Sequence, residues 1–409
     1  MTTSNVGPDP ARPQVVSSPW RRVDPLAAGV AIVACGFGLA VIGFAYRGPA
    51  RVFPAAAAFA VLLLLLTLCV GYLVLRRIRP VHPPPHPASL ACVAWGMTAA
   101  TGCAILANSG LGGIWAKTRG VDFADRWGAA ATAPFDEETL KVCGVLVLAL
   151  LAGRAIRGPV DGWVYGALVG LGFQVVENLL YALDAIVADG ATDPASSVAA
   201  SFAVRVGLTA WGSHWAMSAV AGAGVGFLLA RDGTPLARRV VLALALWGLA
   251  MALHWFFDSP FLPGVGGILL KVAVDLVVAL AVYRAVRRRY VARFRAVAAE
   301  EAATDAVRPS EAVSLPRRGT RRQVRRGPFA RHERALIHAL QDLQLALVEG
   351  RIPHADPDEP AHSQRLRAEI AALRAHLPRE SDPWPAASEP PAGPAPLPRV
   401  HTFSREQRS

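Results

Sequence analysis

The chain has 409 residues, of which 53% are hydrophobic and only 18% charged. Soluble domains carry about a quarter charged residues, so this composition excludes an ordinary soluble protein and indicates a membrane protein. The net charge of +12 suggests a nucleic-acid partner at first. The Arg residues, however, gather at the ends of apolar runs and in the C-terminal tail, without the interleaved aromatic residues of a nucleic-acid surface. We therefore expect no nucleic-acid partner and attribute the charge to membrane topology.

A polar N-terminal segment, residues 1–25, precedes eight apolar runs. The first run is too long for a signal peptide, so it is interpreted as a membrane span. Each run is near the roughly 20 residues that a bilayer core requires. We expect an all-α polytopic membrane protein with about eight transmembrane helices, within a membrane domain of residues 26–295. The predicted spans lie near 26–46, 55–75, 89–108, 138–153, 162–188, 206–230, 237–257 and 265–286.

Positive residues alternate between the loops that join these spans. Lys and Arg gather on cytoplasmic loops of membrane proteins. The loops rich in Arg all fall on the side shared by the two termini, whereas the loop 109–136 carries a balanced mixture of charges. We therefore expect cytoplasmic termini and place the loop 109–136 outside.

The region after Arg295 is charged and rich in proline. Residues 296–330 are interpreted as a flexible basic linker that attracts anionic lipid. Leucines at helical spacing predict two short helices that form a hairpin over 331–377, whose partner the sequence leaves open. Residues 378–409 are expected to be disordered. The five cysteines lie in or beside apolar runs without metal-ligand spacing, which favours apolar packing over a disulfide or a thiolate metal site.

Four polar clusters interrupt the apolar runs. A carboxylate at the centre of a spanning helix costs roughly 3 kcal/mol, so such residues usually mark function. A buried ion pair would explain Glu177 structurally, but no Lys or Arg lies inside a neighbouring predicted span at its depth. Counting 1.5 Å per residue from the span ends places all four clusters at one level in the outer half of the membrane. We therefore predict that they form a single site. The clusters are Glu137-Glu138-x-x-Lys141, Phe173-x-x-x-Glu177-Asn178-x-x-Tyr181, His214 and His254-x-x-x-Asp258.

Local spacing indicates what these residues can do. Lys141 is within helical reach of Glu137 and Glu138, and two such carboxylates in a low-dielectric pocket repel, which suits a proton shuttle. A plain helix N-terminus after Pro134 explains part of the same pattern. His254 and Asp258 are one turn apart, so Asp258 can fix the imidazole tautomer and free the other nitrogen for a metal or a water.

Together, the order and spacing of these motifs resemble those of the PrsW family of intramembrane proteases, over roughly residues 130–260. The resemblance implies a multi-pass enzyme of the bacterial plasma membrane. It would cleave a single-span membrane protein, such as an anti-sigma factor, near the outer face. It also implies that Glu137 or Glu138 is the general base and that Lys141, Asn178 and Tyr181 assist. Glu177, His214 and His254 would be metal ligands, or groups that stabilise the oxyanion and position the water. We also expect Asp258 among the metal-binding residues.

Two His and one or two Glu suit Zn²⁺ with an open fourth position. The same groups could activate water without a metal, and the spacing H-E-x-x-H is absent, so the sequence does not decide between these mechanisms. A transporter that relays protons or binds a cation is the rival class, but the repeated halves typical of transporters are not evident. A scaffold that acts through its tail helices is a third possibility.

Overall fold

The computed structural model of the protein describes residues 24–152, 155–352 and 359–377. Within these ranges the chain is helical and contains no β-strand. Most of the predicted segment 1–25 and all of the predicted disordered tail 378–409 lie outside the described residues. The α-helices are α1 (Pro25–Val52), α2 (Pro54–Ile78), α3 (His86–Trp95), α4 (Thr101–Arg119), α5 (Val121–Leu151), α6 (Pro159–Ala188), α7 (Pro194–Phe202), α8 (His214–Leu229), α9 (Leu236–Asp258), α10 (Gly264–Ala302), α11 (Pro309–Ser314), α12 (Arg318–Arg325), α13 (Arg331–Arg351) and α14 (Glu359–Arg374).

Three short segments have non-α helical geometry. A π-helical segment η1 (Gly96–Ala100) joins α3 to α4, so that these two form one long rod. A second π-helical segment, η2 (Ala203–Leu208), and a 3₁₀ turn, η3 (Ala210–Gly212), lie between α7 and α8. Because π-helical turns are frequent at functional sites, η2 marks a place where functional residues are expected.

Six helical segments in the described chain are long and apolar enough to cross a membrane. The two remaining predicted spans, 138–153 and 206–230, correspond to α5 and α8. Charged residues lie along α5, and α8 is only 16 residues long. Helix length and hydropathy therefore support six of the eight predicted spans in the described chain. The six segments are α1, α2, the rod His86–Arg119, α6, α9 and α10.

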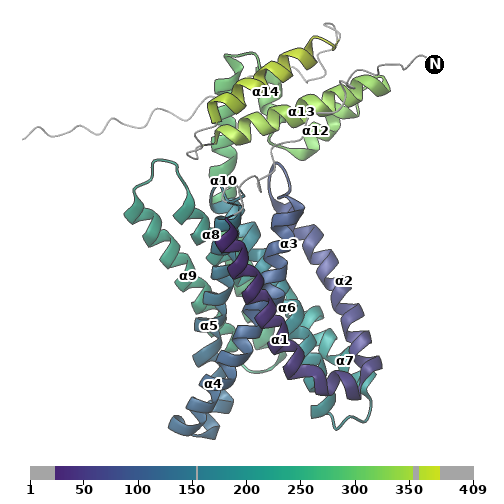
Figure 1. Ribbon diagram of the computed structural model, residues 1–409, viewed down its shortest axis with the longest axis vertical. Helices are drawn as coiled ribbons and strands as arrows, with labels where there is room; N and C mark the ends of the chain where they lie inside the picture. Colours follow the sequence, from purple (N-terminus) through teal and green to yellow (C-terminus); the bar gives the residue numbers. More distant parts are fainter. Residues whose placement is uncertain (1–23, 153–154, 353–358, 378–409) are drawn as a thin grey trace, which may run out of the picture.

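Helix α6 lies at the centre of the bundle and contacts α2, α3, α5 and α8 (Figure 1). Its glycines Gly162, Gly166 and Gly170 face backbone carbonyls of α8, where a methyl group would overlap with them. The small-residue repeat of the sequence therefore has the expected packing role. Helices α1 and α2 lie on the outside and expose large apolar side chains such as Ile32 and Leu62.

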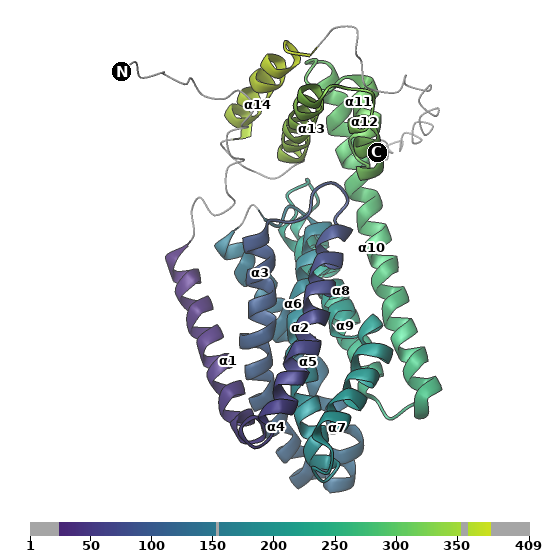
Figure 2. The same ribbon diagram turned by 90° about the vertical axis from the view of Figure 1, so that its right-hand side faces the viewer.

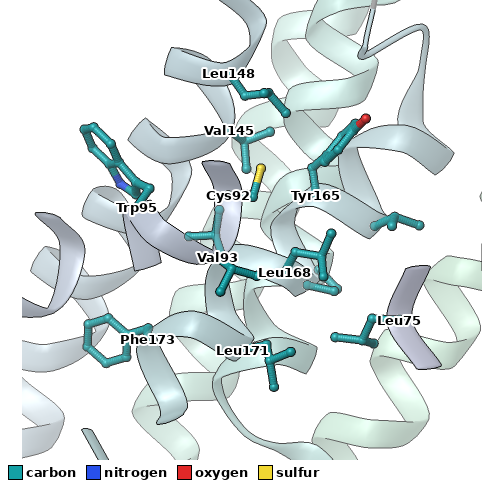
Figure 3. Packing of buried hydrophobic residues seen from close by; sticks show 14 of the residues in the cluster. Leu75, Cys92, Val93, Trp95, Val145, Leu148, Tyr165, Leu168, Leu171 and Phe173 are labelled. Atoms are coloured by element: carbon teal, nitrogen blue, oxygen red, sulfur yellow. The ribbon is translucent and has the colours of Figure 1, made fainter. Parts of the chain in front are cut away.

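The main apolar cluster fills the space between α2, α3, α5 and α6 (Figure 3). Cys92 and Val93 come from α3, Leu168 from α6 and Val145 from α5, and the sulfur of Cys92 points toward Val145. All five cysteines are free, and Cys92 packs inside this cluster, as the sequence predicts. The cluster holds the helices that carry the polar residues described next.

Helix α10 runs along the bundle and continues into the C-terminal helices (Figure 2). Residues 296–330, predicted to be a flexible linker, contain the end of α10 together with α11 and α12. This segment is held in place because Val307, Leu315 and Val324 are buried against neighbouring helices. In α13 and α14, the apolar stripe around Leu340 and Leu347 packs against the stripe around Leu366 and Ile370. We call the end of the molecule that carries these helices the tail end.

Candidate metal centre

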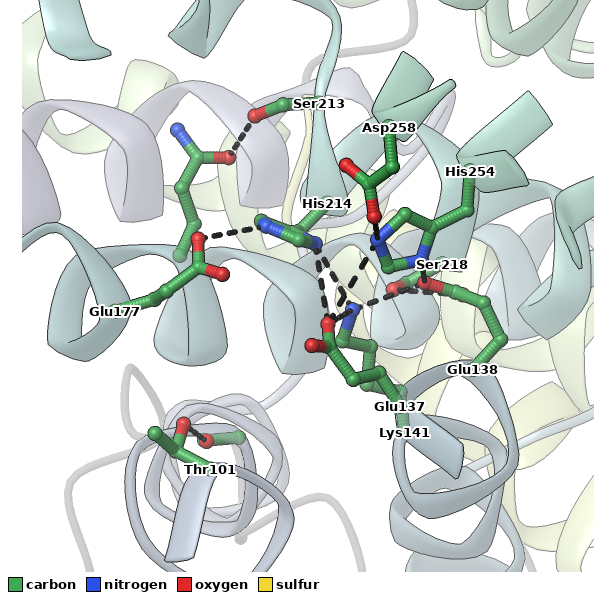
Figure 4. Close-up of polar contacts among 12 residues, drawn as sticks. Thr101, Glu137, Glu138, Lys141, Glu177, Ser213, His214, Ser218, His254 and Asp258 are labelled. Carbon is green, nitrogen blue, oxygen red and sulfur yellow. Dashed lines mark hydrogen bonds and ion pairs between the residues drawn. The ribbon is translucent and has the colours of Figure 1, made fainter. Parts of the chain in front are cut away.

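Four helices bring charged side chains to one point inside the bundle (Figure 4). Glu137, Glu138 and Lys141 come from α5, Glu177 from α6, His214 from the start of α8, and His254 and Asp258 from the end of α9. Glu138, Lys141 and His254 are almost completely buried. The point lies inside protein, as charged groups at membrane depth require.

The two carboxylates of α5 share one ammonium group. Lys141 Nζ lies 3.2 Å from Glu137 Oε2 and 2.9 Å from Glu138 Oε1, as the spacing i+4 and i+3 allows. Both acids were expected near the start of a helix after Pro134. Instead α5 begins at Val121 and Pro134 lies inside it, so the acids are buried at mid-helix. The first half of α5 packs against α4.

The ring of His214 is bonded on both sides. Its Nδ1 lies 2.9 Å from Lys141 Nζ, and its Nε2 lies 2.8 Å from Glu177 Oε2. Because an ammonium group can only donate, Nδ1 must carry the lone pair and Nε2 the hydrogen. Glu177 therefore fixes the tautomer that turns the His214 lone pair toward Lys141 and Glu137.

The ring of His254 is also bonded on both sides. Its Nδ1 lies 3.2 Å from Glu138 Oε1, and its Nε2 lies 3.3 Å from Asp258 Oδ2 and 3.8 Å from Glu137 Oε2. The sequence predicts that Asp258 occupies the nitrogen opposite to the metal. In the structure Glu138 takes that nitrogen, and Asp258 shares Nε2 with Glu137.

Glu137, His214 and His254 form a group that can hold a metal ion. One ligand atom of each lies within 4.8 Å of the other two, and all three residues are buried. Glu137 Oε1 accepts a hydrogen bond of 3.0 Å from Asn108 Nδ2, which leaves Oε2 facing the two rings. The structure thus groups Glu137 with the histidines, whereas the sequence assigned Glu177 and Asp258 to the metal.

Three charged or polar residues near the metal centre are not predicted by the sequence. Arg205 of η2 forms an ion pair with Glu177, so the expectation of no basic partner near Glu177 is wrong. Arg205 directly precedes the predicted span 206–230, and its long side chain reaches back to α6. Asn108, at the end of a predicted span, supports Glu137. Asp275 is fully buried in α10, and neither carboxylate oxygen has a hydrogen-bond partner among the described residues. A polar residue within an apolar run was the available signal for Asn108 and Asp275.

Asn178 and Tyr181 lie at the edge of this centre. Asn178 accepts a hydrogen bond from Arg205, and the half-exposed ring of Tyr181 lies beneath the Arg205 guanidinium group. Neither side chain contacts His214 or His254 directly in the described contacts, so the structure places them around Arg205 instead.

Residues 84–286 match the PrsW family intramembrane metalloprotease. This chain carries a PrsW family domain. It is a multi-pass membrane protein and a peptidase. No curated protein and no solved structure matches the chain. The PrsW domain runs from α3 into α10 and contains every residue of the metal centre, whereas α1, α2 and the C-terminal helices lie outside it.

Proposed function

We propose that this PrsW domain is an endopeptidase whose metal ion is held by Glu137, His214 and His254. The observation that carries the proposal is the pair of carboxylates on the outer ring nitrogens, Glu177 on His214 Nε2 and Glu138 on His254 Nδ1. Metal-binding histidines nearly always donate their other N–H to such an acceptor, which orients the ring and raises its basicity.

The donor set also fits the charge of a metal. One carboxylate oxygen and two imidazole nitrogens are the ligands of catalytic Zn²⁺ sites, which keep a fourth position open for substrate or water. Lys141 Nζ already lies beside Glu137 Oε2 and His214 Nδ1, so these atoms are arranged around a cation. We therefore propose Zn²⁺ as the metal, and the ammonium group of Lys141 must move aside as it binds.

A metal ion in this position would polarise the scissile carbonyl and lower the pKa of an attacking water. The proton of that water needs a base that substrate can approach. Glu138 is fully buried and bonded to Lys141, His254 and Ser218, whereas the Asp258 side chain is 20% exposed beside His254. We assign Asp258 to accept the proton and to return it to the leaving amine, and Glu138 to position His254.

We further propose the membrane arrangement that the charge pattern predicts. Helices α5 and α8 complete eight spans, both termini lie in the cytoplasm of a bacterial cell, and the metal centre lies near the outer face. Its substrate would be a single-span protein of the anti-sigma-factor type, cleaved near that face. His214 begins α8 and Asp258 ends α9, and the turn that joins the other ends of these helices lies toward the tail end in Figure 1, which supports this arrangement.

The test is cleavage of a single-span model substrate by purified protein in liposomes. We expect Glu137→Gln, His214→Ala and His254→Ala to abolish cleavage, because each removes a metal ligand. Asp258→Asn should retain the metal but lower the rate by about 10²–10⁴-fold, the usual contribution of a general base. Asp122→Asn, an exposed change on the same helix as Glu137, is the control. Full activity of His214→Ala and His254→Ala would contradict the assignment.

A further inference from the structure

Lys271 is a buried cation inside the last predicted span. It lies in the apolar run 265–286, on α10, and only 6% of its surface is exposed. A charged side chain at membrane depth is costly, so it usually faces the protein interior and serves a function. Lys271 belongs to none of the four polar clusters of the sequence, so its own contacts indicate its role.

The ammonium group of Lys271 contacts the end of α9. Its Nζ donates hydrogen bonds to two backbone carbonyl oxygens, at 3.0 Å to that of Phe257 and at 2.6 Å to that of Ser259. The last carbonyls of a helix have no partner within it, and positive charge is favourable beside them. Because Phe257 and Ser259 flank Asp258 in the chain, one cation binds the backbone on both sides of the proposed base.

The place of Asp258 in the fold makes these contacts important. Asp258 is the last residue of α9, and a loop that contains Pro260 and Pro263 follows it. Its Oδ2 lies 3.3 Å from His254 Nε2, and its side chain is 20% exposed (Figure 4). Helix ends fray, so the last turn of a helix does not by itself hold a side chain in one place. The hydrogen bonds of Lys271 supply the constraint, and its charge attracts the Asp258 carboxylate.

We propose that Lys271 is a positioning residue for peptide hydrolysis: it holds the last turn of α9 so that the Asp258 carboxylate stays beside His254. A displacement of about 1 Å in a catalytic group can lower a rate by ~100-fold, so such a constraint matters for the reaction. The proposal rests on the proposed endopeptidase function, in which Asp258 accepts the proton of the attacking water. A plain helix cap, by contrast, would stabilise α9 without changing the rate of the metal-loaded enzyme.

Removing the ammonium group is the first test. Lys271→Met keeps an unbranched side chain, and Leu270→Met, at the half-exposed neighbouring position, is the matched control. With the single-span model substrate in liposomes, Lys271→Met should lower kcat by about 10–100-fold while KM and the metal content stay at their wild-type values. Leu270→Met should leave all three unchanged. Full kcat in Lys271→Met, or a loss of metal in proportion to kcat, would overturn the proposal.

A double-mutant cycle shows whether Lys271 acts through Asp258. Residues that act as one unit lose most of the rate singly, so Lys271→Met should lower kcat by less than about threefold in the Asp258→Asn background. Losses that multiply in the double variant would overturn the proposal, even where Asp258→Asn alone is as slow as the proposed function predicts. Full activity of Asp258→Asn would contradict the assigned base and this proposal together.

Hydrogen exchange measures the positioning without any cleavage. In the detergent-purified protein, the amides of residues 256–262 should exchange at least about tenfold faster in Lys271→Met than in wild type or Leu270→Met, because the last turn of α9 is no longer held. Unchanged exchange in Lys271→Met would overturn the proposal at any rate of cleavage. Faster exchange, together with a wild type that cleaves no substrate, would contradict the endopeptidase function and retain Lys271 as the residue that holds Asp258.

Discussion

At the residue scale, the metal centre depends on which ring nitrogen faces inward. His214 turns Nδ1 inward and His254 turns Nε2 inward, and a carboxylate holds the opposite nitrogen of each ring. The identity of the proposed ligands therefore follows from hydrogen bonds that only the folded chain forms.

Glu177→Gln tests the positioning role of Glu177. The amide cannot match the basicity of the carboxylate as an acceptor for the His214 N–H, so metal affinity should fall by about 10–100-fold without being lost. The measurement is competition with a chelating indicator in detergent. Asp184→Asn, an exposed change further along α6, should leave the affinity as it is. Complete loss of metal in Glu177→Gln, equal to that in His214→Ala, would instead make Glu177 a ligand.

The sequence indicates the members of this site better than their roles. Helical spacing and depth along the spans predict that Glu137, Glu177, His214 and His254 meet, because both follow from the geometry of a helix. They do not predict which carboxylate faces which nitrogen, since this depends on the rotation of each helix. Arg205 was missed because it directly precedes the predicted span 206–230, and only its long side chain reaches back from η2 to Glu177.

At the element scale, the close contact of α6 and α8 sets the distance between Glu177 and His214. A methyl group at Gly166 would overlap with the carbonyl oxygen of Ser218, and one at Gly170 with that of His214 itself. The sequence predicts this packing from its small-residue repeat. It does not predict the full length of α5, because a proline at position 134 usually ends a helix.

Gly166→Ala should therefore separate α6 from α8. We expect a loss of roughly 1–3 kcal/mol of stability, as for other overpacked sites, and weaker metal binding. Thermal unfolding in detergent measures the first effect. In Gly248→Ala the added methyl group meets no neighbour, so this change on α9 should leave stability equal or slightly higher. Equal melting temperatures for both variants would show that the contact is not tight.

At the scale of the whole molecule, the C-terminal helices dock on the tail end of the bundle through a buried ionic network. Arg79, which follows α2, lies 2.6 Å from Asp161 of α6 and 2.8 Å from Glu349 of α13. His82 Nδ1 lies 3.2 Å from Glu349 Oε2. In the predicted lipid-binding linker, Arg318 donates to the backbone carbonyl of Arg77 at the end of α2 and to those of Arg79 and Val81 in the loop that follows, so this cation holds the fold together.

Docking of the tail should depend on pH. Burial disfavours the His82 imidazolium, but the neighbouring carboxylates of Asp342 and Glu349 outweigh it and raise the pKa of His82 above 6.5. Burial also disfavours the Glu349 carboxylate, but Arg79 and His82 outweigh it and hold the pKa of Glu349 well below 4.5. His82 thus stabilises docking fully below pH 6.5 and less as the pH rises through its raised pKa. Glu349 stabilises docking above pH 4.5 and less as the pH falls through its lowered pKa.

Docking of the tail should therefore be strongest between pH 4.5 and pH 6.5. Hydrogen exchange of α13, corrected for the intrinsic rate at each pH, measures it. His82→Gln should flatten the response on the alkaline side and leave the acidic side as it is. Protection of α13 that stays constant from ~pH 4 to ~9 would show that the network does not control docking.

The central claim is that Glu137, His214 and His254 hold a catalytic metal, and elemental analysis of the detergent-purified protein tests it most directly. The claim predicts about one Zn²⁺ per chain in wild type, as in other three-ligand catalytic sites, and none in His214→Ala or His254→Ala. It also predicts that chelation removes the metal and cleavage together, and that Zn²⁺ restores both. Wild-type protein that contains no metal and cleaves its substrate at full rate would contradict it.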